Sequence, residues 1–119
     1  MLAGVNRLRS AGDFRMCSRY GVKAGSGTLL VYYYRRLSHA EDPPRIGIIA
    51  SKKVGNAVIR NHVKRRLRHI IREHISELHD GDLVVIRALP QAASASFAQL
   101  SGAVHSCLSR AQKKVEDRI

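Results

Sequence analysis

Hydrophobic and polar positions recur along the chain with two spacings, one typical of helices and one typical of strands. Near the start, Ser10 followed by Asp13 has the spacing of a helix N-terminus, and Gly21 is suited to end that helix. Runs rich in Val, Ile and Tyr then predict strands over 28–37 and 45–51. The connection between these two strands is short, so we expect them to form an antiparallel pair.

The second half of the chain predicts a long helix, a strand and a last helix. Asn56 is suited to cap a helix over 57–78, and residues 83–88 read as a strand. The apolar side of the long helix holds Ile59, Val63, Leu67, Ile70, Ile71 and Leu78. Ser94 or Ser96 opens the last helix. Its apolar stripe is formed by Phe97, Leu100, Val104, Cys107, Leu108 and Ala111.

These elements, with a further short strand near Val22-Lys23, give the order α-β-β-β-α-β-α. We therefore expect an α+β fold, built as a two-layer α-β sandwich of helices against one sheet. A chain of 119 residues fits one domain over 1–119 and leaves no room for two. The charged segment 113–119 is expected to fray at the end of that domain.

Charge changes this picture more than any other feature of the composition. Lys and Arg number 21 against nine Asp and Glu, a formal net charge of +12. Such a surplus on a small body is typical of proteins that bind a polyanion, above all a nucleic acid. A membrane surface is the alternative, but residue 2 is not Gly and no apolar run approaches a membrane span. We therefore expect a cytoplasmic protein without membrane attachment, in which Cys17 and Cys107 are buried thiols.

Basic residues are concentrated between 52 and 72, where the chain has no acidic residue. They are Lys52, Lys53, Arg60, Lys64, Arg65, Arg66, Arg68 and Arg72. On a helix, one band beside the apolar side collects Asn61, Lys64, Arg65, Arg68 and Arg72. Like charges at this spacing cost roughly 0.2–0.5 kcal/mol per pair, so we interpret the band as a surface for regularly spaced phosphates. The helix start, with Gly55 and its basic neighbours, is a further seat for phosphate.

A second candidate surface contains aromatic residues. Phe14 in the first helix and Leu30, Tyr32 and Tyr34 on one strand face form an apolar stripe, which plain core would also produce. However, the run Tyr32 to Tyr34 places phenols on both sheet faces, and aromatic residues on an open sheet face stack the bases of single-stranded RNA. The residues alone leave both interpretations open.

The chain contains no pattern that predicts catalysis. There is no G-x-x-x-x-G-K-[ST] loop and no H-x-x-x-H pair, and His105 and Cys107 lack the further ligands of a zinc site. Asp80 and Asp82 flank a glycine and read as a turn. We therefore predict no catalytic residue, no metal site and no small-molecule substrate, and expect another molecule to carry any chemistry.

The segment 52–68 reads KKVGNAVIRNHVKRRLR and resembles the signature of the protein subunit of bacterial ribonuclease P, roughly K-K-x-G-x-A-V-x-R-N-R-x-K-R-x-x-R. Further agreement lies at Arg7-Leu8-Arg9-Ser10, Asp13-Phe14, Gly21, Arg45-Ile46-Gly47 and the strand after Asp82. The resemblance covers most of the chain and is weakest from Gln91 onward.

This resemblance implies a function and a topology. The partner would be a large catalytic RNA that, with Mg²⁺ bound mainly by the RNA, hydrolyses a phosphodiester to remove the 5′ leader of precursor tRNA. The chain would be the protein subunit of this ribonucleoprotein endoribonuclease and would grip the single-stranded leader. The long basic helix would form a β-α-β crossover between the strands at Ile46 and Leu83, of an unusual left-handed sense.

The resemblance also assigns residues to these two surfaces. The family's basic motif maps onto the band, and the predicted RNA-binding residues are Lys52, Lys53, Arg60, Asn61, Lys64, Arg65, Arg68 and Arg72. The leader-binding cleft is expected at Phe14, Leu30 and Tyr32, with Lys52 and Lys53 near its end. Two residues depart from the family pattern. His62 replaces an arginine and should point away from the band, and Ser18 replaces a second aromatic residue of the first helix.

Three other functions compete with this interpretation. A structural RNA-binding protein, such as a ribosomal protein, would need the basic band but no cleft. A self-sufficient nuclease would need an acidic cluster to hold metal ions, whereas the nine acidic residues are scattered. A DNA-binding module would satisfy the charge, but no helix-turn-helix pattern supports it.

Overall fold

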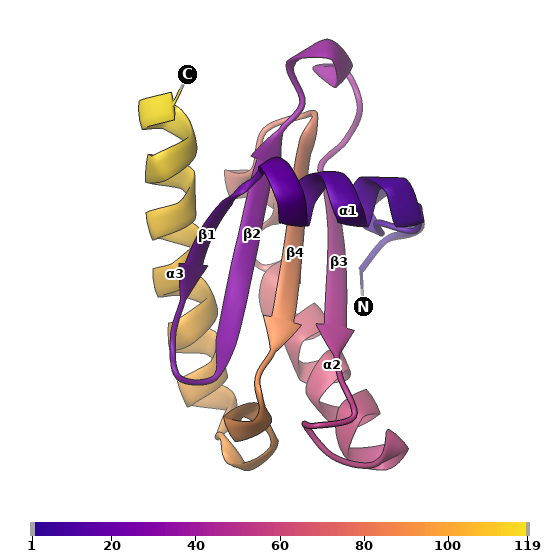
Figure 1. Ribbon diagram of the computed structural model, residues 1–119, viewed down its shortest axis with the longest axis vertical. Helices are drawn as coiled ribbons and strands as arrows, with labels where there is room; N and C mark the ends of the chain where they lie inside the picture. The colour runs from indigo at the N-terminus through magenta and orange to yellow at the C-terminus, as the bar shows by residue number, and fades with distance from the viewer. Residues whose placement is uncertain (1, 119) are drawn as a thin grey trace.

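The computed structural model describes residues 2–118, which fold into three α-helices and one four-stranded sheet (Figure 1). The elements in chain order are α1 (Ala11–Tyr20), β1 (Val22–Gly25), β2 (Leu29–Arg35), β3 (Arg45–Ala50), α2 (Ala57–Arg72), β4 (Asp82–Ala88) and α3 (Phe97–Arg118). The predicted α+β class and the order α-β-β-β-α-β-α are confirmed. None of the described helices combines the length and the apolar composition that crossing a membrane requires.

The strands lie in the order β1-β2-β4-β3. β2 runs antiparallel to both β1 and β4, and β3 runs parallel to β4. The predicted direct pairing of 28–37 with 45–51 is therefore wrong, because β4 lies between these two strands. Residues 83–86 of β4 are completely buried, so this strand needs cover on both faces and pairing on both edges, and the centre of the sheet supplies both.

β3, α2 and β4 form the parallel crossover that the resemblance implies. In Figure 1 both strands point downward, β4 lies to the left of β3, and α2 passes behind the sheet. This arrangement is a left-handed crossover, whereas nearly all connections of this kind are right-handed. It places α2 behind the β3 edge of the sheet.

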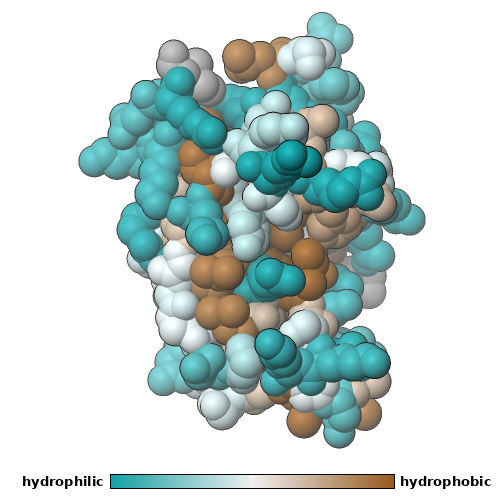
Figure 2. Space-filling view, in the orientation of Figure 1, coloured by the Kyte–Doolittle hydropathy of each residue, from teal (hydrophilic) through white to brown (hydrophobic). Residues whose placement is uncertain are grey.

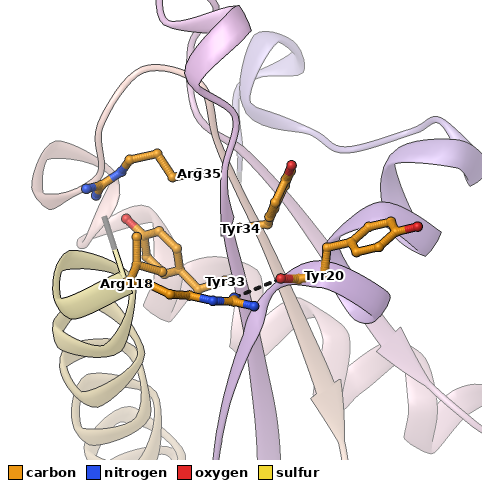
Figure 3. A pocket seen from close by; sticks show the side chains of 6 residues that line it. Tyr20, Tyr33, Tyr34, Arg35 and Arg118 are labelled. Carbon is orange, nitrogen blue, oxygen red and sulfur yellow. Dashed lines mark hydrogen bonds between the residues drawn. The ribbon is translucent and has the colours of Figure 1, made fainter.

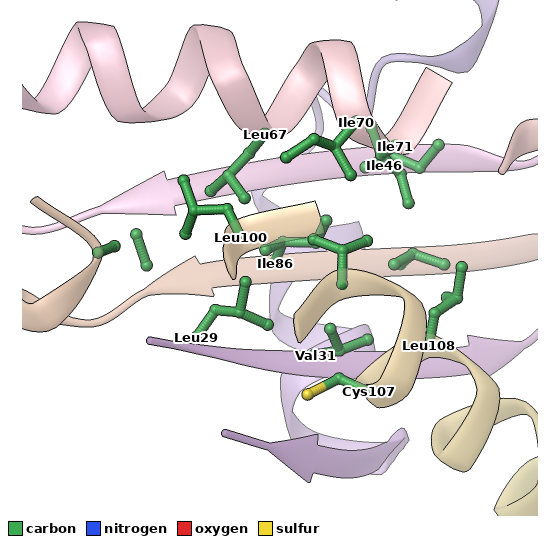
Figure 4. Packing of buried hydrophobic residues seen from close by; sticks show 14 of the residues in the cluster. Leu29, Val31, Ile46, Leu67, Ile70, Ile71, Ile86, Leu100, Cys107 and Leu108 are labelled. Atoms are coloured by element: carbon green, nitrogen blue, oxygen red, sulfur yellow. The ribbon is translucent and has the colours of Figure 1, made fainter. Parts of the chain in front are cut away.

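The main core lies between the sheet and the helices α2 and α3, which cover the same face (Figure 4). Alternate residues of the strands point into it, as the strand period requires. The labelled side chains that meet there are Leu29, Val31, Ile46, Leu67, Ile70, Ile71, Ile86, Leu100, Cys107 and Leu108. These two layers are the predicted α-β sandwich.

α1 lies across the opposite face of the sheet and covers only part of it (Figure 1). The predicted cap is present, since the Ser10 hydroxyl accepts a hydrogen bond from the Asp13 N–H at 3.4 Å. The helix ends at Gly21, where a Cβ would lie only 2.4 Å from the Cys17 carbonyl oxygen. Burial raises the pKa of the Cys17 thiol to about 12, so this thiol stays protonated. Cys17 and Cys107 are both free and buried, as predicted.

Both long helices differ from the prediction near one end. α2 ends at Arg72 and not at residue 78, because the chain forms a 3-10 turn over Ile75–Glu77 on its way back to β4. Ile59 is 39% exposed and Phe97 is 43% exposed, although the helical pattern assigned both to the core. Each lies in the first turn of its helix. Apolar spacing identifies the buried face of a helix, but not where along the axis its neighbours begin.

The charged segment 113–118, for which we expected fraying, is helical as the end of α3, and its basic side chains reach the backbone of other elements. Lys114 Nζ donates to the Lys23 carbonyl at 2.7 Å, and Arg118 Nη1 donates to the Tyr20 carbonyl at 2.8 Å. Figure 3 shows Arg118 reaching across from α3 to the end of α1, beside Tyr33 and Tyr34. The end of the segment, residue 119, lies outside the described residues.

A buried carboxylate fixes the start of β4. Asp82 is fully buried and accepts hydrogen bonds from the Tyr33 hydroxyl, from Arg35 Nε at 2.9 Å and from the His79 backbone N–H at 2.9 Å. Burial, and then the hydrogen bond to Asp82, raise the pKa of the Tyr33 hydroxyl, which therefore remains a donor. The turn before β4 thus joins β2 and β4 by a polar network and not by apolar packing alone.

Replacing this carboxylate should destabilise the fold strongly. Asp82→Asn keeps the size of the side chain but leaves Arg35 without its charge partner, so we expect the free energy of unfolding to fall by about 2–4 kcal/mol. Urea unfolding of the variant beside wild type measures this loss. Asp80→Asn changes an exposed residue of the same turn and serves as the control. Equal, small effects of both substitutions would show that the network contributes nothing specific.

Candidate nucleic-acid interface

The basic band lies on a helix whose start and buried face are well defined. The Asn56 side chain accepts a hydrogen bond from the Ile59 N–H at 3.0 Å, which confirms the predicted cap of α2. Val63, Leu67, Ile70 and Ile71 are buried against the sheet and α3. The predicted band residues Asn61, Arg65 and Arg72 are exposed, whereas Lys64 and Arg68, and Arg60 beside the band, are half-buried. All six therefore lie outside the fully buried face of α2.

Almost none of the positive charges of the band is paired with a carboxylate of the protein. Within residues 2–118, the basic residues at 60, 64, 65 and 68 have no carboxylate within ion-pairing distance. Arg72 Nη2 lies 3.7 Å from Glu73 Oε1, but both side chains are exposed, and such a pair contributes little. The Arg60 Nε is buried and lacks a hydrogen-bond partner in the described chain. Mutual repulsion and an unpaired donor both favour an anionic ligand on this side of α2.

Two neighbours of the band behave differently from each other. Arg66 donates from Nη1 to the Ala95 carbonyl at 3.1 Å, so it connects α2 to the segment before α3, which agrees with its position away from the band. His62, by contrast, lines a hollow of about 280 Å³ together with Asn61 and Arg65. His62 thus borders the edge of the band, and the expectation that its side chain points away from the band stays a prediction. Residues three apart are neighbours on a helix surface, so His62 adjoins Arg65.

The second candidate surface is the part of the sheet that α1 leaves uncovered, and we call it the open sheet face. It contains the predicted residues Leu30 and Tyr32, together with Ile49 and Arg87. Figure 2 shows apolar side chains gathered below α1, with hydrophilic side chains between them. Leu30 and Tyr32 are half-buried, while Tyr33 of the same strand points to the main core. The tyrosine run is thus divided between the core and an accessible face.

Phe14 of α1 forms the upper boundary of the open sheet face. A Cβ on Gly47 would lie 2.4 Å from the Phe14 ring, so the ring packs directly against the backbone of β3. Phe14, Tyr32 and Ile49 are partly buried around the same small cluster, which has Cys17 and Val85 among its members. Phe14 and Tyr32 therefore border the same cluster, and their role in a leader-binding cleft stays a prediction. Ser18, the departure from the family pattern, is exposed on α1.

Cations lie at the end of the open sheet face that is farther from α1, where β3 ends (Figure 1). Lys52 and Lys53 are exposed in the turn after β3. Lys53, Leu30 and Arg87 line one hollow of about 450 Å³, together with Ser51 and Pro90. Lys53 thus lies beside Leu30, one of the residues predicted for the cleft.

Arg87 is the residue of this surface that sequence analysis missed. It is exposed in an otherwise buried strand, and its register places it between Leu30 of β2 and Ile49 of β3. The pattern already contained the signal, because a single arginine interrupts the apolar run 83–88. Recognising which face it occupies required the strand order, since the alternation alone does not tell which face α1 leaves open.

The described residues contain no group of three His, Cys, Asp or Glu side chains placed to hold a metal ion. What they offer is a band of cations and an aromatic face with cations at one end. The first can bind a phosphate backbone, and the second can stack bases and hold the phosphates between them.

Known proteins with similar sequences belong to one family. The sequence profile of the Ribonuclease P family matches residues 2–112. The chain is 47% identical over 115 residues to a ribonuclease P protein component from Nocardioides, covering 97% of this chain and 98% of that one. It is 42% identical over 119 residues to the component from Arthrobacter, covering 100% of this chain and 86% of that one.

Solved structures of the same family share the fold. The ribonuclease P protein of Staphylococcus aureus superposes with a TM-score of 0.79 at 26% identity, covering 89% of this chain and 94% of that chain. The protein of Thermotoga maritima superposes with a TM-score of 0.73 at 23% identity, covering 87% and 96%, and supports the fold alone. From its sequence relatives and the length of the family match, this chain belongs to the Ribonuclease P protein family.

Proposed function

We propose that this protein is the RNA-binding subunit of a ribonucleoprotein endoribonuclease that removes the 5′ leader of precursor tRNA. In this proposal the basic band binds the catalytic RNA, and the open sheet face binds the single-stranded leader. The observation that carries the proposal is that one small chain of the Ribonuclease P family holds both surfaces on different elements. We expect it to act in the cytoplasm.

Each surface has the chemistry its ligand requires. Arg65 and its neighbours on the band present planar guanidinium groups that fork onto phosphate oxygens, and the excess of cations makes release of counterions a large part of the binding free energy. On the open sheet face, Phe14 and Tyr32 offer rings for stacking, while Lys53 and Arg87 are placed for leader phosphates.

The protein contributes positioning and charge in this proposal, and the RNA contributes catalysis. Mg²⁺ held mainly by the catalytic RNA would activate the attacking water and stabilise the leaving oxygen. The chain itself holds the leader beside the RNA and neutralises phosphate repulsion between the two. Both effects lower the Mg²⁺ concentration needed for assembly and substrate binding.

Cleavage assays test the function directly. At low Mg²⁺ concentration, precursor tRNA should be cut at the mature 5′ end by a bacterial ribonuclease P RNA together with this protein, and much more slowly by either one alone. Cleavage by the protein alone would instead support the nuclease alternative. Binding to the RNA without any stimulation of cleavage would favour a structural RNA-binding protein.

Substitutions should separate the two surfaces. Arg65→Glu reverses one charge of the band and should weaken assembly with the catalytic RNA by about tenfold or more, because a charged hydrogen bond to phosphate is lost. Tyr32→Ala removes a stacking ring and should weaken leader binding by about tenfold. Leader binding is measured as the difference in affinity between precursor tRNA and mature tRNA without a leader.

Matched variants control for charge and for folding. Lys113→Glu alters an exposed site on α3 by the same charge and should leave assembly nearly unchanged. Tyr32→Phe retains the ring and should retain leader binding, whereas Tyr20→Ala removes an exposed ring outside the open sheet face. Equal losses of both functions in Arg65→Glu and Tyr32→Ala would contradict two separate surfaces.

Arg87 should act as a phosphate contact for the leader. We expect Arg87→Gln to weaken binding of leader-containing substrate by about tenfold, and to lower the slope of log affinity against log salt by about 0.7, the value for one single-stranded phosphate. Affinities measured across a series of salt concentrations give that slope. Lys113→Gln removes the same charge elsewhere on the protein. This variant should keep the wild-type difference in affinity between precursor tRNA and mature tRNA. An unchanged salt slope in Arg87→Gln would refute the assigned role.

A further inference from the structure

A small pocket on the β3 edge of the sheet brings together three arginines from distant parts of the chain. It has a volume of about 210 Å³ and is lined by Arg7 and Arg9 of the N-terminal segment and by Arg68 of α2. Its remaining walls include the Phe14 ring and the backbone of β3 around Gly47. Figure 1 shows the N-terminal segment beside β3, with α1 and α2 on opposite faces of the sheet. The pocket therefore lies where the two faces meet.

No carboxylate balances the charge of this pocket. None of its lining residues is acidic, and within residues 2–118 neither Arg7, Arg9 nor Arg68 forms an ion pair. Arg7 and Arg68 are half-buried, so solvent screens their repulsion less well than it screens charges on an open surface. Three arginine side chains that line one pocket are more stable together when an anion lies among them.

The pocket is held in shape by the backbone around it. The N-terminal segment pairs with the sheet edge through a bridge between Arg7 and Ile46, and the Leu8 N–H donates to the Ile46 carbonyl at 3.0 Å. Leu8 is buried against the cluster beneath α1, and Arg7 Nε donates to the Leu2 carbonyl at 3.3 Å. Because these contacts fix the segment without any ligand, an anion would enter a site that is already formed.

We infer that this pocket binds one phosphate group of an RNA backbone through Arg7, Arg9 and Arg68. Guanidinium groups match phosphate oxygens in geometry, and three of them can saturate the exposed oxygens of a single phosphodiester. The inference rests on the proposed function for the source of the phosphate. Arg68 belongs to the band and Phe14 bounds the open sheet face, so the bound phosphate would lie at the junction of the two RNA-binding surfaces.

The arginine side chains themselves can report the binding. We would label the full chain with ¹⁵N, follow the Nε–Hε resonances, and titrate with inorganic phosphate and separately with a short oligouridine without terminal phosphate, at constant ionic strength. The resonances of Arg7, Arg9 and Arg68 should shift together and saturate with one dissociation constant. Arg9→Gln or Arg68→Gln should weaken that binding by about tenfold, and Lys113→Gln by less than about twofold.

The outcomes discriminate between the possible sources. Saturable shifts with the oligouridine, alone or in competition with inorganic phosphate, support an RNA phosphodiester. Saturation with inorganic phosphate only would overturn the assignment to RNA. Shifts that grow in proportion across all exposed arginines, or an Arg9→Gln variant that behaves like Lys113→Gln, would show general charge screening and overturn the pocket. Arg9 is exposed, so its loss leaves the fold intact. The titration needs no catalytic RNA, so failure of the cleavage assay and failure of this pocket are separate results.

Discussion

The central position of β4 in the sheet determines where the basic band and the open sheet face lie. Its side chains are buried on both faces except for Arg87, and it is paired on both edges, with β2 on one side and β3 on the other. β3 must then occupy the outer edge, and the chain must cross one face of the sheet to reach β4. That crossing is α2, and it brings the basic band to the β3 edge. Asp82 fixes the start of the strand by tying it to Tyr33 and Arg35.

The two faces of the sheet are covered unequally, so the face that forms the main core differs from the face that is available to a ligand. α2 and α3 together enclose the main core, whereas α1 covers only the upper part of the opposite face. The uncovered part keeps strand side chains that would be buried in a symmetric three-layer protein. Positive charge is likewise left unpaired along α2. A protein selected for stability alone would cover the apolar face and intersperse acidic residues among the cations, so both features have a cost that the proposed RNA ligand would offset.

Local features of this fold could be predicted from the sequence, and long-range ones could not. The caps at Ser10 and Asn56 follow from hydrogen bonds within a few residues, and the band follows from helical spacing. The insertion of β4 between β2 and β3 depends on which strand is most apolar on both faces and so gains most from a central position. Local patterns do not show how the strands compare in this respect. The same limit applies to the site. Arg87 is visible as a charge in an apolar run, but only the strand order places it on the open sheet face.

Contact between Phe14 and Gly47 links the two candidate surfaces physically. The ring lies against the β3 backbone so closely that a methyl group on Gly47 would displace it. One side of the ring bounds the open sheet face, and the pocket at Arg7 and Arg68 also includes it in its wall. An RNA strand on the open sheet face and an RNA strand on the band would therefore approach each other at this ring. Communication between them would need only electrostatic and steric contact across one side chain, with no change in the fold.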